Sequence, residues 1–167
     1  MNNVITNNIN YRIINNPFWK EDVTEITAFD FLNTGNVIQS KILLLERTKA
    51  RYEEIADSTN GSNFGEVSSY DKHRERKAGF IKWIDKIMEV ENHIENLKAT
   101  LSAWIKLADT QIDKVENLDY AIILKLRFIE QMSYEEISKK IFVSLATVRR
   151  WNRLAIYEFQ RTNGYSE

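Results

Sequence analysis

The chain has 167 residues, of which 43% are hydrophobic and 28% are charged, a composition typical of a globular protein with one ordinary domain or two small ones. A formal net charge of −1 argues against a protein that coats nucleic acid nonspecifically, and the absence of cysteine excludes disulfides and thiolate metal sites. A signal-peptide pattern and a long apolar run are both missing, so we expect a cytoplasmic protein. With one Pro and five Gly among abundant Ile, Leu, Lys and Glu, the composition favours an all-α fold.

The first third of the sequence predicts a flexible arm and two helices. We expect residues 1–15 to form the arm, after which the Asn-Pro pair at 16–17 supplies the cap and first turn of a helix. This helix is predicted to end near the Asn-Thr-Gly sequence at 33–35. Asn36 is then expected to cap a second helix, and the composition of residues 58–69 predicts a loop that lets two helices lie antiparallel.

A heptad pattern dominates the centre of the chain, within a long helix that Ser68 and Asp71 are expected to cap. One series of apolar residues consists of Phe80, Ile87, Ile94, Leu101, Ala108 and Val115, and a second, three positions later, of Trp83, Val90, Leu97 and Trp104. Such a seam predicts a long helical hairpin with coiled-coil-like packing. Part of the seam should pack on the preceding helix, and the remainder could form a homodimer through residues 80–115, which makes residues 16–116 a helical bundle and oligomerisation part.

Two short helices joined by a tight turn are predicted between residues 133 and 161. Ser133, with Glu136 three positions later, forms the pattern of a capping box at the start of the first helix. After a connection at residues 142–143, Ser144 can cap a second helix. Apolar residues recur along this second helix at Val148, Trp151, Ala155 and Phe159. The arrangement is typical of a helix-turn-helix, whose second helix reads the major groove of DNA.

The exposed face of the second helix carries small, polar and basic side chains. The predicted DNA-contacting residues are Ser144, Leu145, Ala146, Thr147, Arg149, Arg150 and Arg153. Arginine can pair bidentately with guanine or with a phosphate, and the methyl groups of Thr and Ala can contact thymine. Residues 144–161 hold four Arg and one acidic residue, so basic charge is concentrated on this helix. The alternative interpretation is that these arginines form only a solvated helix face.

The sequence from about Asn117 to Phe159 resembles the region-4 helix-turn-helix of bacterial sigma factors. Residues 135–149 match its pattern Glu-Glu-Ile-small-x-x-aliphatic-Gly-Val-Ser-x-x-x-Val-Arg except at the Gly, and residues 118–130 look like the helix that packs under the motif. With its helical N-terminal part, the chain is similar to the RinA and ArpU type of late-transcription activator of bacteriophages and prophages. The resemblance implies a DNA-binding domain at residues 117–167, double-stranded DNA and RNA polymerase as partners, and location in the bacterial cytoplasm.

Phe142 occupies the turn position that the family pattern gives to Gly. A left-handed backbone conformation would be costly for a phenylalanine. We therefore expect either an altered turn or a Phe142 side chain that packs beneath the domain.

We expect no enzymatic activity, cofactor or metal site. His73 and His93 lack a second ligand one helical turn further on, and no phosphate-binding loop, zinc-protease motif or nucleophile elbow occurs. Trp83 and Trp104 fall in the heptad seam, so packing explains them better than ligand stacking. Two alternatives to a DNA-binding regulator stay open: a helical protein-interaction module that targets a host partner, and a DNA-packaging recognition subunit similar to a small terminase.

Overall fold

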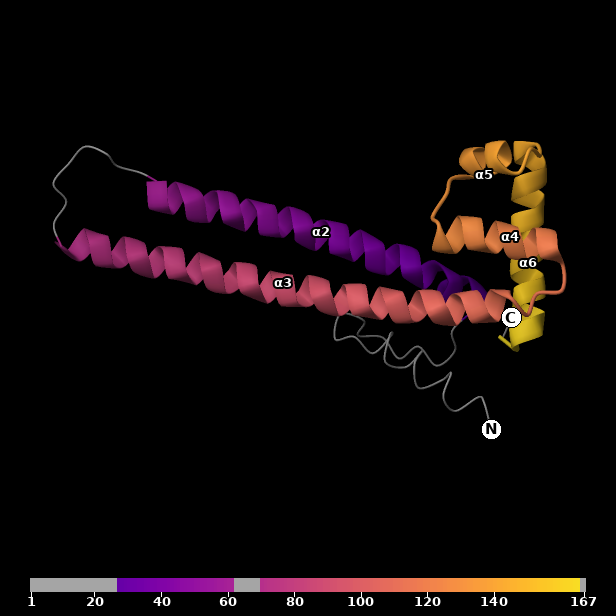
Figure 1. The fold of residues 1–167 in the computed structure, drawn as a ribbon, viewed down its shortest axis with the longest axis horizontal. Coiled ribbons are helices and arrows are strands. Elements are labelled where there is room, and N and C mark those ends of the chain that lie inside the picture. Colours follow the sequence, from indigo (N-terminus) through magenta and orange to yellow (C-terminus); the bar gives the residue numbers. More distant parts are fainter. Residues whose placement is uncertain (1–26, 62–69, 166–167) are drawn as a thin grey trace. The chain divides into compact units, whose positions relative to one another are not determined.

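The computed structural model describes residues 27–61 and 70–165, and these residues form helices with short connections and no strand (Figure 1). The helices are α2 (Ala28–Gly61), α3 (Tyr70–Ile112), α4 (Leu118–Leu124), the π-helical segment η1 (Lys125–Ile129), α5 (Tyr134–Lys140) and α6 (Leu145–Asn163). The predicted all-α class is therefore confirmed. The predicted arm at 1–15, the first-turn pair at 16–17 and the cap at Ser68 lie outside the described residues.

The helix break predicted at residues 33–36 is wrong, because α2 runs unbroken through this region. Gly35 is a packing residue here. A Cβ atom at position 35 would lie only 2.2 Å from Cζ3 of Trp104, so only glycine lets the indole ring approach the α2 backbone this closely. Asn36 is an interior helix residue whose carbonyl oxygen accepts a hydrogen bond from Ser40 Oγ at 2.8 Å. A contact distant in the sequence thus overrides the local signal for a helix end.

Residues 34–105 form one of two compact units, in which α2 and α3 lie side by side and antiparallel (Figure 1). Tyr52 of α2 contacts Trp83 of α3, with ring centroids 5.3 Å apart. Other seam residues of α3 are buried, namely Ile87, Ile94, Leu97 and Trp104, and so are Ile38, Ile42 and Ala56 of α2. Much of the heptad seam is therefore buried within a single chain, as expected for a helical hairpin.

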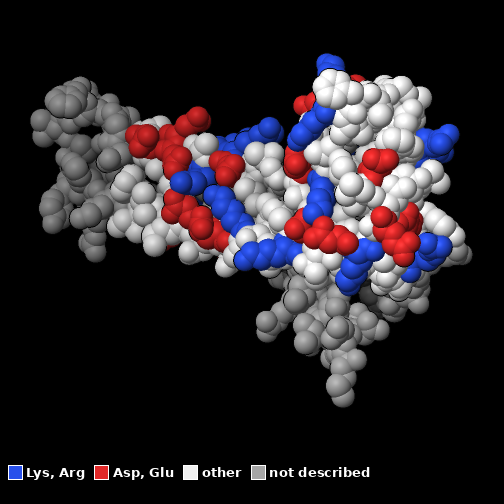
Figure 2. Space-filling model, turned by 45° about the vertical axis from the view of Figure 1, so that its right-hand side comes forward, with Lys and Arg blue, Asp and Glu red and all other residues white. Residues whose placement is uncertain are grey.

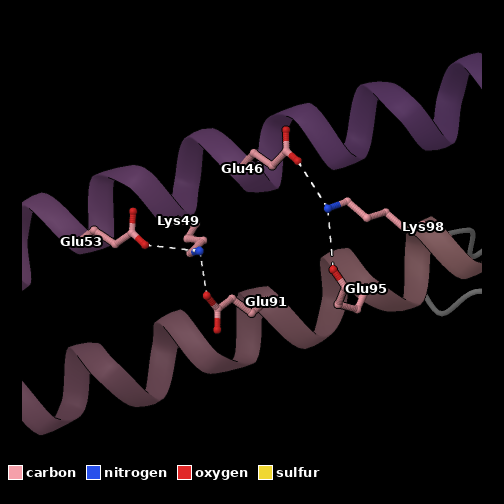
Figure 3. A network of polar contacts seen from close by, with 6 residues as sticks. All are labelled: Glu46, Lys49, Glu53, Glu91, Glu95 and Lys98. Carbon is pink, nitrogen blue, oxygen red and sulfur yellow. Dashed lines mark ion pairs between the residues drawn. The ribbon is translucent and has the colours of Figure 1, made fainter.

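Two groups of ion pairs link the exposed edges of α2 and α3 (Figure 3). Lys49 lies 2.7 Å from Glu91 and 3.4 Å from Glu53, and the Glu91 carboxylate is the main cause that raises the Lys49 pKa above its usual value. The second group is Lys98 with Glu46 and Glu95, at 3.9 and 3.7 Å. Exposed pairs of this kind add little stability.

The other compact unit contains residues 27–33 and 106–165 of the described chain. Its core cluster consists of Ile123, Leu126, Ile137 and Val148, which belong to α4, η1, α5 and α6. Near the end of α6, the rings of Phe31, Phe159 and Tyr165 stack with centroids 5.6 to 6.0 Å apart. The domain boundary predicted after residue 116 stays a prediction. Next to it, α4 begins after the N-cap Asn117, whose side chain accepts hydrogen bonds from two backbone N–H groups.

Candidate nucleic-acid interface

The α5 helix begins at the predicted capping box. Ser133 Oγ accepts a hydrogen bond from the Glu136 N–H at 3.2 Å, and the Glu136 carboxylate accepts one from the Ser133 N–H at 2.7 Å. The backbone hydrogen bond from Ser133 is the main cause that lowers the Glu136 pKa below its usual value. Both donors would otherwise be unsatisfied at the helix start, so the predicted cap is confirmed and its carboxylate is charged at neutral pH.

The connection between α5 and α6 keeps a tight turn although it contains no glycine. Ser138 Oγ donates to the Val143 carbonyl oxygen at 2.6 Å, and the Val143 N–H donates to the Ser138 carbonyl oxygen at 3.2 Å. Between them Phe142 adopts a left-handed backbone conformation with φ of 57°, and its side chain is 94% exposed. The expected altered turn or packing beneath the domain is therefore wrong: the reciprocal bonds hold the turn, and the ring points into solvent.

Ser144 caps the start of α6, as predicted. Ser144 Oγ accepts from the Thr147 N–H at 3.1 Å and also lies 2.7 Å from the Thr147 hydroxyl oxygen. One face of the helix is buried, at Val148, Asn152, Ala155 and Phe159. A helix of this length with one buried face leaves a continuous opposite face for a partner.

Most of the predicted contact residues lie on this open face of α6. Ser144, Ala146, Arg149, Arg150 and Arg153 are exposed, whereas Leu145 and Thr147 are half-buried. The structure thus brings the three arginines and one small side chain together within the first three turns. The half-buried Leu145 and the Thr147 hydroxyl, which is engaged with Ser144, are less accessible than the sequence predicted.

A polar chain connects the segment before α5 with the buried face of α6. The Arg127 side chain donates to the Met132 carbonyl oxygen at 2.8 Å, and its guanidinium lies 4.7 Å from the centre of the Tyr134 ring. Asn152 Nδ2 of α6 donates to the Tyr134 hydroxyl at 3.3 Å. These contacts, together with the apolar core cluster, hold α6 at a fixed angle to α5.

The arginines lie in a mixed electrostatic environment. Arg149 is 3.8 Å from Glu135 of α5, and both side chains are more than half exposed. Figure 2 shows basic and acidic side chains intermingled on the face it draws, in agreement with the net charge of −1. Because an exposed ion pair such as this one is weak, Arg149 can leave Glu135 and bind a phosphate at little cost in free energy.

Within residues 142–163, three exposed apolar side chains were not recognised from the sequence. Besides Phe142, these are Leu154 and Tyr157 of α6, which are 41% and 62% exposed. Helical periodicity could have placed Tyr157 on the same face as Arg150 and Arg153, since it follows them by seven and four positions.

Other kinds of site are not found within residues 27–61 and 70–165. No group of three or more His, Asp or Glu side chains there could hold a metal ion. None of the helices in those ranges is both long enough and apolar enough to cross a lipid bilayer.

The helical fold and the exposed basic face of α6 define a small all-α protein with a candidate nucleic-acid interface. Residues 75–160, more than half of the chain, match the family described as "Protein of unknown function (DUF1492)", and the chain belongs to this family. The matched region extends from α3 into α6 and includes every predicted contact residue. Among curated proteins and among solved structures, none matches the chain.

Proposed function

We propose that the chain is a sequence-specific DNA-binding regulator of transcription, of phage or prophage origin, in which α5 and α6 form a helix-turn-helix. The observation that carries the proposal is the exposed cluster of Arg149, Arg150 and Arg153 at the start of a helix whose opposite face is buried. In such a motif the first turns of the second helix enter the major groove, and the first helix crosses the backbone. The likeness to sigma-factor region 4 supports RNA polymerase as the protein partner.

The three arginines have the chemistry that both base recognition and phosphate binding require. A guanidinium can bind guanine O6 and N7 bidentately, or it can bind a phosphate, and Ala146 beside them is small enough to approach a thymine methyl group. The low overall charge is compatible with this proposal because specific binding depends on a local basic surface rather than on the charge of the whole chain.

The proposal can be tested by selection from genomic DNA. The wild-type protein is mixed with fragments of its own genome at several salt concentrations, and retained fragments are sequenced. One or a few fragments should be retained by wild type and lost by the Arg149→Ala/Arg150→Ala variant. Arg47→Ala/Arg51→Ala is the matched control, because it removes the same charge from exposed positions of α2. Equal retention by all three proteins, or no retention by wild type, would overturn the proposal.

A helical protein-interaction module is the second candidate, and the exposed Leu154 and Tyr157 favour it. Exposed aromatic side chains are frequent anchors in protein interfaces. If α6 docks on a protein, Tyr157→Ala should abolish capture of that partner while Arg149→Ala/Arg150→Ala leaves it intact. A DNA-packaging subunit would instead form rings. The mass of the assembly in solution distinguishes a ring from a dimer.

A further inference from the structure

Phe142 combines two unfavourable features in the folded protein. Its φ of 57° lies in the left-handed region, which is rarely adopted by a bulky side chain, and its ring is 94% exposed to solvent. The ring therefore contributes almost nothing to the core, while glycine at this position would remove the backbone strain. Conformational outliers of this kind cluster at functional sites and persist where the surrounding structure holds them, as the hydrogen bonds between Ser138 and Val143 do here.

The chain on either side of Phe142 carries more basic than acidic side chains. The segment 130–153 holds five basic and three acidic residues. Lys139 and Lys140 at the end of α5 precede the turn, and Lys140 is paired with Glu130 at 2.7 Å. On the other side, Phe142 stands two residues before the Ser144 cap of α6. An apolar ring that follows two lysines in the chain and precedes a proposed recognition helix suits a DNA groove better than an apolar protein surface, which would have to desolvate the lysines.

We propose that Phe142 is a specificity-determining residue whose ring contacts the C5-methyl group of a thymine at the edge of the site read by α6. The inference rests on the proposed function. Thymine presents its methyl group in the major groove, and phenylalanine is one of the side chains that can contact it there. Phe142 lies two residues before the Ser144 cap of α6, the helix that carries Ala146 and Arg150, so that one thymine and the adjacent bases would be recognised together.

The test uses a genomic fragment retained by wild type, with each thymine of the site replaced in turn by uracil, which lacks only the methyl group. Affinities are measured for wild type and for Phe142→Gly. Glycine adopts the left-handed conformation readily, so the turn is kept, and thermal unfolding confirms that the variant is folded. Leu44→Ala is the matched control, because it removes an exposed apolar side chain from the other unit.

We expect uracil at one position to weaken wild-type binding about fourfold, as estimated for one buried methyl group. Phe142→Gly should bind the thymine site about fourfold more weakly than wild type does and should not respond to uracil at that position. The Leu44→Ala control should behave as wild type.

Failure of the proposed function and failure of the role of Phe142 give different results. If wild type retains no DNA, the proposed function fails, and this inference fails with it. If wild type retains DNA and Phe142→Gly binds it equally well, only the role of Phe142 is overturned. A weaker Phe142→Gly that keeps the full uracil response would also overturn the thymine contact, and it would place the ring on the sugar-phosphate backbone or on a protein.

Discussion

At Gly35 the lack of a side chain allows the ring of Trp104 to lie against the backbone of α2. The Trp104 side chain is only 1% exposed, and it would meet any Cβ at residue 35 at 2.2 Å. The substitution of a glycine in a helix usually has two opposite effects on stability, namely a gain in helix propensity and a change in packing. Here the packing effect should be the larger one because the colliding atoms belong to a rigid, buried ring.

Gly35→Ala should lower the free energy of unfolding by about 1–3 kcal/mol through overpacking, even though alanine recovers roughly 1 kcal/mol of helix propensity. Urea unfolding followed by circular dichroism measures the change. Leu44→Ala, at an exposed position of the same helix, should shift the free energy of unfolding by no more than about 0.5 kcal/mol. A Gly35→Ala protein as stable as wild type would contradict the close approach of Trp104.

The α5 helix depends on its capping box, since seven residues form too short a helix to persist alone. Ser133→Ala removes the hydroxyl that accepts from the Glu136 N–H, and it should lower the free energy of unfolding by about 1 kcal/mol. Ser102→Ala, at an exposed position inside α3, should instead be neutral or slightly stabilising because alanine is the better helix former. Thermal unfolding distinguishes the two. Equal effects of both substitutions would argue against the cap.

Glu136 makes the same cap dependent on pH. Its pKa is lowered in the folded protein, so its charge contributes stability that is present above the unfolded-state pKa of a glutamate and is lost as pH falls through the lower folded-state pKa. Glu136→Gln keeps a hydrogen-bond acceptor but has no charge. The melting temperature of wild type should exceed that of this variant at pH 7, and the difference should shrink below about pH 4.3. A difference independent of pH from 7 to 3 would contradict the role of the charge.

At the scale of elements, the features that depend only on neighbouring residues, such as helix caps, were predicted best from the sequence. The caps at Ser133 and Ser144 were readable because each depends on a residue three positions away. The continuity of α2 at Gly35 was not readable because it depends on Trp104, about seventy residues later. The exposure of Phe142 was missed for a similar reason: the Ser138 to Val143 hydrogen bonds hold the turn despite its strain, and sequence patterns do not report them.

At the scale of the whole molecule, the oligomeric state decides how many recognition helices one particle carries. Much of the heptad seam is buried within one chain, whereas Ile81, Ile84 and Met88 of α3 are exposed. If the proposed homodimer forms through residues 80–115, these side chains are its apolar contact. Two recognition helices would then bind half-sites about 34 Å apart.

Sedimentation at micromolar concentration should give twice the mass of one chain, and Ile84→Glu/Met88→Glu should reduce it to the mass of a monomer. The double variant should keep its helical circular dichroism, because both side chains are exposed in the single chain. A wild-type monomer would contradict the dimer, and a ring of several chains would favour the DNA-packaging alternative.

The central claim is that the arginine face of α6 binds DNA, and the salt dependence of binding tests it most directly. On a retained fragment, the slope of the logarithm of affinity against that of salt concentration reports the number of phosphates contacted, at about 0.9 for each. If Arg149 and Arg150 both bind phosphates, Arg149→Ala/Arg150→Ala should reduce the slope by about 2. If one of them reads a base instead, the slope should fall by about 1 and discrimination among fragments should decrease. Arg47→Ala/Arg51→Ala should leave the slope and the discrimination among fragments unchanged. An equal effect of the two double variants would contradict the claim that the arginine face of α6 binds DNA.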